Sequence, residues 1–163
     1  MRSHYQNIVL TKKLEQMTDL KQLHQKDFNL WTEKVKSKIQ QRDFENMDWD
    51  NLLDEIEDMG KSDKRALRSY TQRLIEHIFK LNYWKEEYDR NKNSWKLEII
   101  NFRTQISNIL EDSPSLRNYL KDNYSTWYEQ SLKKYRQSRV FAVPNHKIIE
   151  LEKMLNDNYF GEL

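Results

Sequence analysis

Apolar residues recur along most of this chain at steps of three and four positions, the spacing that gathers side chains on one face of an α-helix. The clearest stripe lies near the middle of the chain: Leu67, Tyr70, Leu74, Ile78 and Leu81. Another follows at steps of four, three, four and three: Trp95, Ile99, Phe102, Ile106 and Ile109. The pattern therefore predicts a chain built from long helices.

Capping and breaking residues divide the first half of the pattern. A first helix is predicted to begin near Asp19 and end near Arg42, and a second begins after Asp48. Gly60 is predicted to end the second helix, since glycine adopts the left-handed conformation found at many helix C termini. An uninterrupted helix through Gly60 is the alternative, because one glycine costs only about 1 kcal/mol relative to alanine. Otherwise Ser62 starts a third helix that carries the clearest stripe.

Polar residues and a proline separate the helices that follow. Residues 85–93 are predicted to form a connection, so that the fourth helix begins at Asn93 or Ser94. Ser113 is expected to cap the fifth helix, with Pro114 at its first position, where the missing N–H of proline costs nothing. These signals predict short connections between neighbouring helices.

The two ends of the chain are patterned less strongly. Residues 1–18 are predicted to form an extension or a short helix. Pro144 breaks the chain ahead of a short C-terminal helix, and Tyr159 and Phe160 beyond it are expected to pack back onto the other helices.

Composition supports the same architecture. Only two glycines and two prolines occur in 163 residues, whereas sheet proteins need turn residues at short intervals. No linker or repeat divides the chain. The sequence therefore predicts an all-α fold, a compact bundle of four to five principal helices with a short C-terminal helix, in a single domain over residues 19–163.

Charge and cysteine content bound the class of protein. The chain has no cysteine, which excludes disulfides and thiolate metal sites, and 28 basic residues nearly balance 26 acidic ones. Mean hydropathy is −1.05, and no apolar run reaches the roughly 20 residues of a membrane helix or resembles a signal peptide. We therefore expect a cytoplasmic protein with no membrane association.

Blocks of residues resemble a known family. The first blocks are Asp27-Phe28-x-x-Trp31 and Asp48-Trp49-x-x-Leu52-x-x-Glu55-Ile56-Glu57-x-Met59-Gly60. The later blocks are His77-Ile78-Phe79-Lys80-Leu81, Tyr83-Trp84, Asn91-x-x-x-Trp95-x-x-Glu98-Ile99 and Leu110-Glu111-Asp112-Ser113-Pro114-Ser115-Leu116. Together they are similar to a bacterial family common in cyanobacteria, domain of unknown function number twenty-nine, over roughly residues 24–160. The resemblance implies an all-α cytosolic protein and brings no catalytic residues with it.

Polar residues in the middle of the chain give one weak candidate site, formed by Glu57, Arg73 and His77. Di-metal bundles need Glu and His three residues apart, but Glu76 and His77 are adjacent and point about 100° apart on a helix. Arg73 and His77 are spaced more closely than the Arg and His of helical ribonucleases. We expect structural roles for these side chains and no bound metal or cofactor.

Charged and aromatic clusters suggest two kinds of binding. The basic residues Lys133, Lys134, Arg136 and Arg139 surround Tyr135 and could hold phosphates, or they could simply complement a helix dipole. The acidic run from Asp54 to Asp58 favours pairing between helices or between subunits just as naturally.

Aromatic residues give the strongest functional hint. Trp31, Trp49 and Trp95 lie on apolar stripes and are predicted to be core. The pairs Tyr83-Trp84 and Trp127-Tyr128 are harder to bury, and exposed aromatic residues are enriched at protein interfaces. The sequence thus favours a non-enzymatic protein–protein interaction module that uses this aromatic surface, either with a partner protein or in a homodimer. The alternative is a nucleic-acid-binding protein or a toxin–antitoxin component.

Overall fold

The computed structural model describes residues 20–145 and 147–161, and these residues contain helices and no strand, which confirms the all-α prediction. The 1–18 extension lies outside them. After a helical segment over residues 20–26, the order is α2 (Phe28–Gln41), α3 (Trp49–Tyr83), α4 (Lys85–Asp112), α5 (Leu116–Ser138) and α6 (Leu151–Met154). Contacts within the chain define two units, residues 1–60 and 61–163. The single-domain organisation over residues 19–163 stays a prediction.

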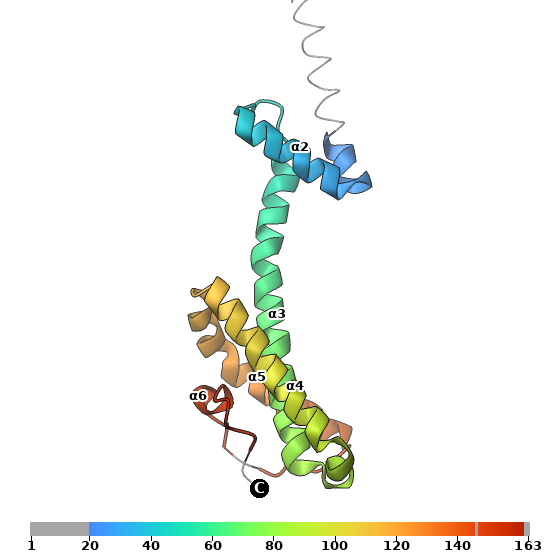
Figure 1. The fold of residues 1–163 in the computed structure, drawn as a ribbon, viewed down its shortest axis with the longest axis vertical. Coiled ribbons are helices and arrows are strands. Elements are labelled where there is room, and N and C mark those ends of the chain that lie inside the picture. The colour runs from blue at the N-terminus through green and yellow to red at the C-terminus, as the bar shows by residue number, and fades with distance from the viewer. Residues whose placement is uncertain (1–19, 146, 162–163) are drawn as a thin grey trace, which may run out of the picture. The chain divides into compact units, whose positions relative to one another are not determined.

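In the first unit, Asp27 divides what was expected to be one helix. Its main-chain N–H closes the preceding turn by donating to Leu23 O, and its side-chain oxygen accepts from Leu30 N at 3.0 Å as the N-cap of α2. The α2 helix lies across the first turns of α3 (Figure 1). Between them lies a small core of four buried residues: Leu20, Trp31, Val35 and Met47.

The α3 helix runs through Gly60 without a break, so the uninterrupted alternative is correct and the predicted helix end is wrong. A Cβ atom built at Gly60 meets nothing within 4 Å. Helix-forming residues flank the glycine on both sides and no proline follows, so its cost of about 1 kcal/mol does not end the helix.

The α4 helix begins at Lys85, whereas residues 85–93 were expected to form a connection. Its first turn carries Glu86 and Glu87, whose negative charges interact favourably with the positive end of the helix dipole. At its other end, Ser113 is the C-cap of α4 and not the N-cap of α5. The boundary at Ser113-Pro114 is confirmed, but α5 begins two residues later, at Leu116.

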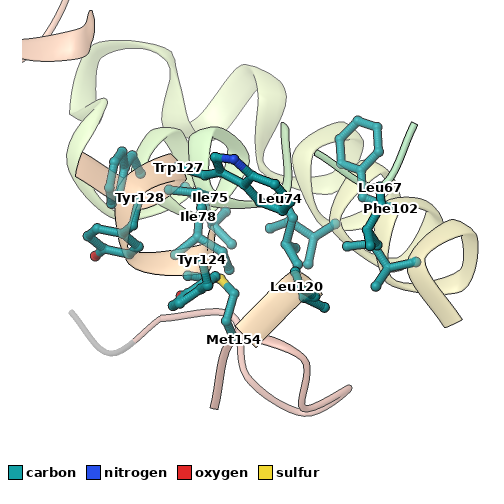
Figure 2. Close-up of a cluster of buried hydrophobic side chains, with 14 of the residues drawn as sticks. Leu67, Leu74, Ile75, Ile78, Phe102, Leu120, Tyr124, Trp127, Tyr128 and Met154 are labelled. Atoms are coloured by element: carbon teal, nitrogen blue, oxygen red, sulfur yellow. The ribbon is translucent and has the colours of Figure 1, made fainter. Parts of the chain in front are cut away.

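In the second unit, α4 and α5 run alongside residues 61–83 of α3 (Figure 1). Twenty apolar or aromatic residues are buried between these elements. Figure 2 shows Tyr124, Trp127 and Tyr128 of α5 beside Ile75 and Ile78 of α3, with Met154 of α6 reaching into the same cluster. The two predicted stripes, from Leu67 to Leu81 and from Trp95 to Ile109, face this core.

The C-terminal segment is held onto the helices mainly through its carbonyl groups. Arg103, which is 5% exposed, donates from Nε to Met154 O at 3.0 Å and from its two terminal nitrogens to the main-chain oxygens of Asp157 and Tyr159. Asn82 Nδ2 donates to Phe160 O at 3.0 Å. Tyr159 and Phe160 are partly buried against the core, as expected.

Candidate functional site

The aromatic residues expected at the surface are mostly interior, which is a correction to the sequence analysis. Trp127 is 3% exposed and Tyr128 is fully buried. Trp84 is half-buried and stacks between Trp95 and Phe141, with ring centroids 5.8 and 5.3 Å away. Tyr83 beside it is partly buried, and burial raises the pKa of its hydroxyl. Because these rings fill the core of the second unit, they do not form an open aromatic surface.

The opposite correction applies to Trp49. Trp31 and Trp95 are core residues as predicted, but Trp49 is 46% exposed. Three further apolar side chains in the first turns of α3 are more open still: Leu53 at 61%, Ile56 at 57% and Met59 at 71%. Among the described residues, twelve large apolar side chains are exposed, and eight of them lie within residues 28–59 of the first unit.

These exposed side chains form one face of a helix. Trp49, Leu53 and Ile56 are four and three residues apart, so they share a face, and Gly60 lies on the same face one turn later. Phe44 adds to the start of the stripe, since its ring centroid lies 6.2 Å from that of Trp49. Large exposed apolar patches on soluble proteins commonly mark interaction sites.

Carboxylates surround this stripe unevenly: at 100° per residue Glu57 lies next to Leu53, whereas Asp54 and Asp58 lie farther round the helix. Residues 48–59 contain six acidic side chains and no basic one. We call the stripe of Trp49, Leu53, Ile56 and Met59, together with Asp54, Glu57 and Asp58, the acidic apolar face. The last three are exposed, and Asp54 forms no hydrogen bond or ion pair within the described residues.

The other three carboxylates hold α3 to its neighbours in the first unit. Asp48 is 3% exposed, and its Oδ2 accepts from the indole N–H of Trp31 at 3.1 Å and from Asn51 Nδ2 at 2.7 Å. Glu55 Oε1 lies 2.8 Å from His24 Nε2. Lys21 Nζ donates to Asp50 at 2.8 Å, which lowers the pKa of that carboxyl. These contacts fix the helix that presents the face.

The weak polar site is not assembled as one cluster. Glu57 belongs to the first unit, whereas Arg73 and His77 belong to the second. The Nδ1 atom of His77 lies 2.8 Å from the main-chain oxygen of Arg73, and its ring packs edge-on against Phe102. Burial lowers the pKa of His77, and the described residues contain no group of three or more potential metal ligands. A structural role for His77 stays a prediction.

The basic residues near the end of α5 are divided between two places. Lys134 points toward α3, where its Nζ donates to Glu76 at 2.7 Å. Lys133, the residue before it, is exposed. Arg136 donates to Pro144 O at 3.2 Å and lines a separate hollow with Arg139. The four residues do not form one patch, because neighbours two apart on a helix point about 200° apart.

Sequence reasoning found the acidic run but not the exposure of the stripe beside it. An apolar stripe on a helix predicts that these side chains pack against another element. Only the tertiary structure shows whether such an element is present. The sequence signal that could have indicated this surface was the absence of any basic residue within residues 48–59.

Comparison with known proteins gives one result. No curated protein and no solved structure matches this chain. Among the helices that the structure describes, none has the length and apolar character needed to cross a membrane. A family model matches residues 23–160, nearly the whole chain, and the chain therefore belongs to the family described as "Domain of unknown function DUF29".

Proposed function

We propose that this protein is a helical protein–protein interaction module whose acidic apolar face binds a basic amphipathic helix of a partner protein. The observation that carries the proposal is the stripe of Trp49, Leu53, Ile56 and Met59, each 46–71% exposed on one helix. Covering such side chains removes apolar surface from water, which is the main driving force for association.

The chemistry of the partner follows from the negative charge of this part of α3, with Glu57 at the edge of the stripe and Asp54 and Asp58 farther round the helix. Asp54, Glu57 and Asp58 would repel an acidic partner and attract lysine or arginine side chains. Recognition of a helix through side chains at steps of three and four is a recurring mode, in which apolar anchors enter the stripe and charges pair at its rim.

The small core of the first unit also supports the proposal. Among the described residues of this unit, four apolar side chains form the buried core, while eight remain exposed between residues 28 and 59. A bound helix would enlarge that core by covering Leu53 and Ile56.

The test uses a model peptide of about 18 residues, with leucine on one helical face and lysine on the other. Its fluorescein-labelled form is titrated with the full chain, and binding is followed by fluorescence anisotropy. We expect saturable binding that Leu53→Asp weakens more than about tenfold, which corresponds to about 1.4 kcal/mol. Leu97→Asp is the matched control, because Leu97 on α4 is 68% exposed and lies outside the face.

Three outcomes would overturn the proposal. Equal binding by wild type and Leu53→Asp would show that the stripe is not part of the binding site. Equal binding of a peptide with glutamate in place of lysine would show that the carboxylates do not select the partner. A wild-type dimer that Leu53→Asp converts to a monomer, measured by analytical ultracentrifugation, would make a second copy of the chain the occupant.

A further inference from the structure

A second surface, in the other unit, carries the opposite charge. A groove of about 290 Å³ lies between α3 and α5 and is lined by four cationic side chains and one carboxylate: Arg65, Arg68, Arg73, Lys134 and Glu76. We call it the basic groove. All of its lining residues belong to the second unit, so it is separate from the acidic apolar face.

Most of the positive charge in the basic groove has no counter-charge. Glu76 is engaged by Lys134 at 2.7 Å and by the hydroxyl of Tyr135. Arg68 donates to the neutral amide oxygen of Gln130 at 3.0 Å. Within the described residues, the guanidinium groups of Arg65 and Arg73 form no hydrogen bond or ion pair. Three arginine charges are therefore left to attract an anion.

The spacing of these arginines distinguishes a chain of phosphates from a single one. Arg65 and Arg73 are eight residues apart on α3, which places their Cα atoms about 12 Å apart along the helix. A single phosphate would need these side chains to converge on one point, whereas successive phosphates of a backbone can use arginines spread along that length of helix. Arginine suits this task because its planar group binds phosphate oxygens with two parallel hydrogen bonds.

The other groove residues favour a duplex over a single strand. Proteins that bind single strands stack bases on aromatic side chains, whereas the described residues that line this groove include none. Gln72 Nε2 donates to Gln130 at 3.1 Å, so amide groups that could bind phosphate or sugar oxygens lie between the arginines. We propose that the basic groove binds the phosphate backbone of a nucleic-acid duplex, without reading its sequence.

The test titrates the full chain into labelled DNA and RNA duplexes of roughly 24 base pairs, at about 50 to 250 mM NaCl. Three phosphate contacts predict a slope of about −3 for log K against log salt. Arg73→Gln should reduce that slope by about one and weaken binding several-fold at the lowest salt. The triple variant R65Q/R68Q/R73Q should abolish measurable binding while keeping the helical circular dichroism of the wild type.

Arg117→Gln is the matched control. Arg117 is exposed near the start of α5 and is turned away from the groove-facing positions of that helix, so its removal changes the net charge equally and should leave the slope unchanged. The proposal is overturned if the triple variant binds like wild type, if Arg117→Gln loses as much as Arg73→Gln, or if neither duplex binds at the lowest salt. Preferential binding of a single strand, or competition by ATP at equal phosphate concentration, would also overturn it.

Discussion

At the scale of single residues, Arg103 shows how a charged side chain can serve as a structural support. It lies on the apolar side of α4, four residues after Ile99, and its guanidinium points at three carbonyl groups of the C-terminal segment. Burial lowers the pKa of this arginine, while the carbonyl oxygens provide polar partners for its charge.

Replacing this side chain should loosen the C-terminal segment. We expect Arg103→Met to lower the free energy of unfolding by about 3 kcal/mol, because hydrogen bonds to a charged group are worth about 1.5–3 kcal/mol each and do not add fully. Urea denaturation followed by circular dichroism measures the change. Arg117→Met, at an exposed site, should cost less than about 0.5 kcal/mol. Equal stability of the two variants would contradict the structural role of Arg103.

His77 gives a pH dependence with a defined sign. Its Nδ1 lies beside the carbonyl oxygen of Arg73, which can only accept, so the neutral ring carries its proton there. Burial holds the pKa of His77 below 6.5 in the folded protein, while the unfolded chain keeps the ordinary value. The stability that the neutral ring provides is therefore complete above pH 6.5 and is lost as the pH falls toward the folded pKa.

We expect the stability difference between wild type and His77→Gln to shrink as the pH falls from about 7.5 to about 5. Urea denaturation of both proteins at both pH values measures this difference, in which the other titrating groups cancel. NMR titration of the His77 ring should independently give a pKa below 6.5. A ring that titrates above 6.5 would reverse the sign and refute the prediction.

At the scale of whole elements, the sequence predicted helix positions better than helix ends. The buried stripe from Leu67 to Leu81 and the break at Ser113-Pro114 follow from periodicity and from the geometry of proline. The start of α4 at Lys85 does not, because residues 85–93 carry little apolar pattern. Their helix is supported by lysine and glutamate propensity and by the dipole, which are weaker signals than a stripe.

The two glycines should respond in opposite ways to replacement by alanine, and Gly60 tests the continuity of α3. Gly60 is inside α3 with open space around its missing Cβ, so Gly60→Ala should raise the free energy of unfolding by about 0.5–1 kcal/mol. Gly161 has a φ of +90°, and a Cβ there would collide with the side chain of Asn82. Gly161→Ala should therefore lose about 2 kcal/mol. Thermal and urea denaturation measure both, and destabilisation by Gly60→Ala would place a helix end at that glycine.

At the scale of the whole molecule, the candidate sites depend on information that periodicity does not contain. The acidic run and the basic residues are visible in the sequence, but Lys134 and Arg136 are close neighbours that line different hollows. Arg65, Arg68 and Arg73 become one site only because α5 lies beside α3 and brings Lys134 and Gln130 to them. Pairing between distant helices depends on packing, which a single sequence leaves open.

The unequal cores of the two units lead to a last prediction. Among the described residues, four apolar side chains are buried in the core of the first unit and twenty in that of the second, so local opening should cost less in the first. Hydrogen–deuterium exchange read by mass spectrometry should therefore show faster exchange for peptides within residues 20–47 than for peptides within residues 67–128.

The variant Asp48→Ala separates this explanation from simple differences in exposure. It removes the buried acceptor of Trp31 and Asn51, so exchange within residues 20–47 should accelerate further while residues 67–128 keep their wild-type rates. Asp112→Ala is the control, since this exposed carboxylate has no hydrogen bond or ion pair within the described residues. Equal exchange in both regions of the wild type would contradict the idea that the first unit is the weaker one. If the model peptide then slows exchange in residues 20–47, the binding helix supplies the packing that this small core lacks.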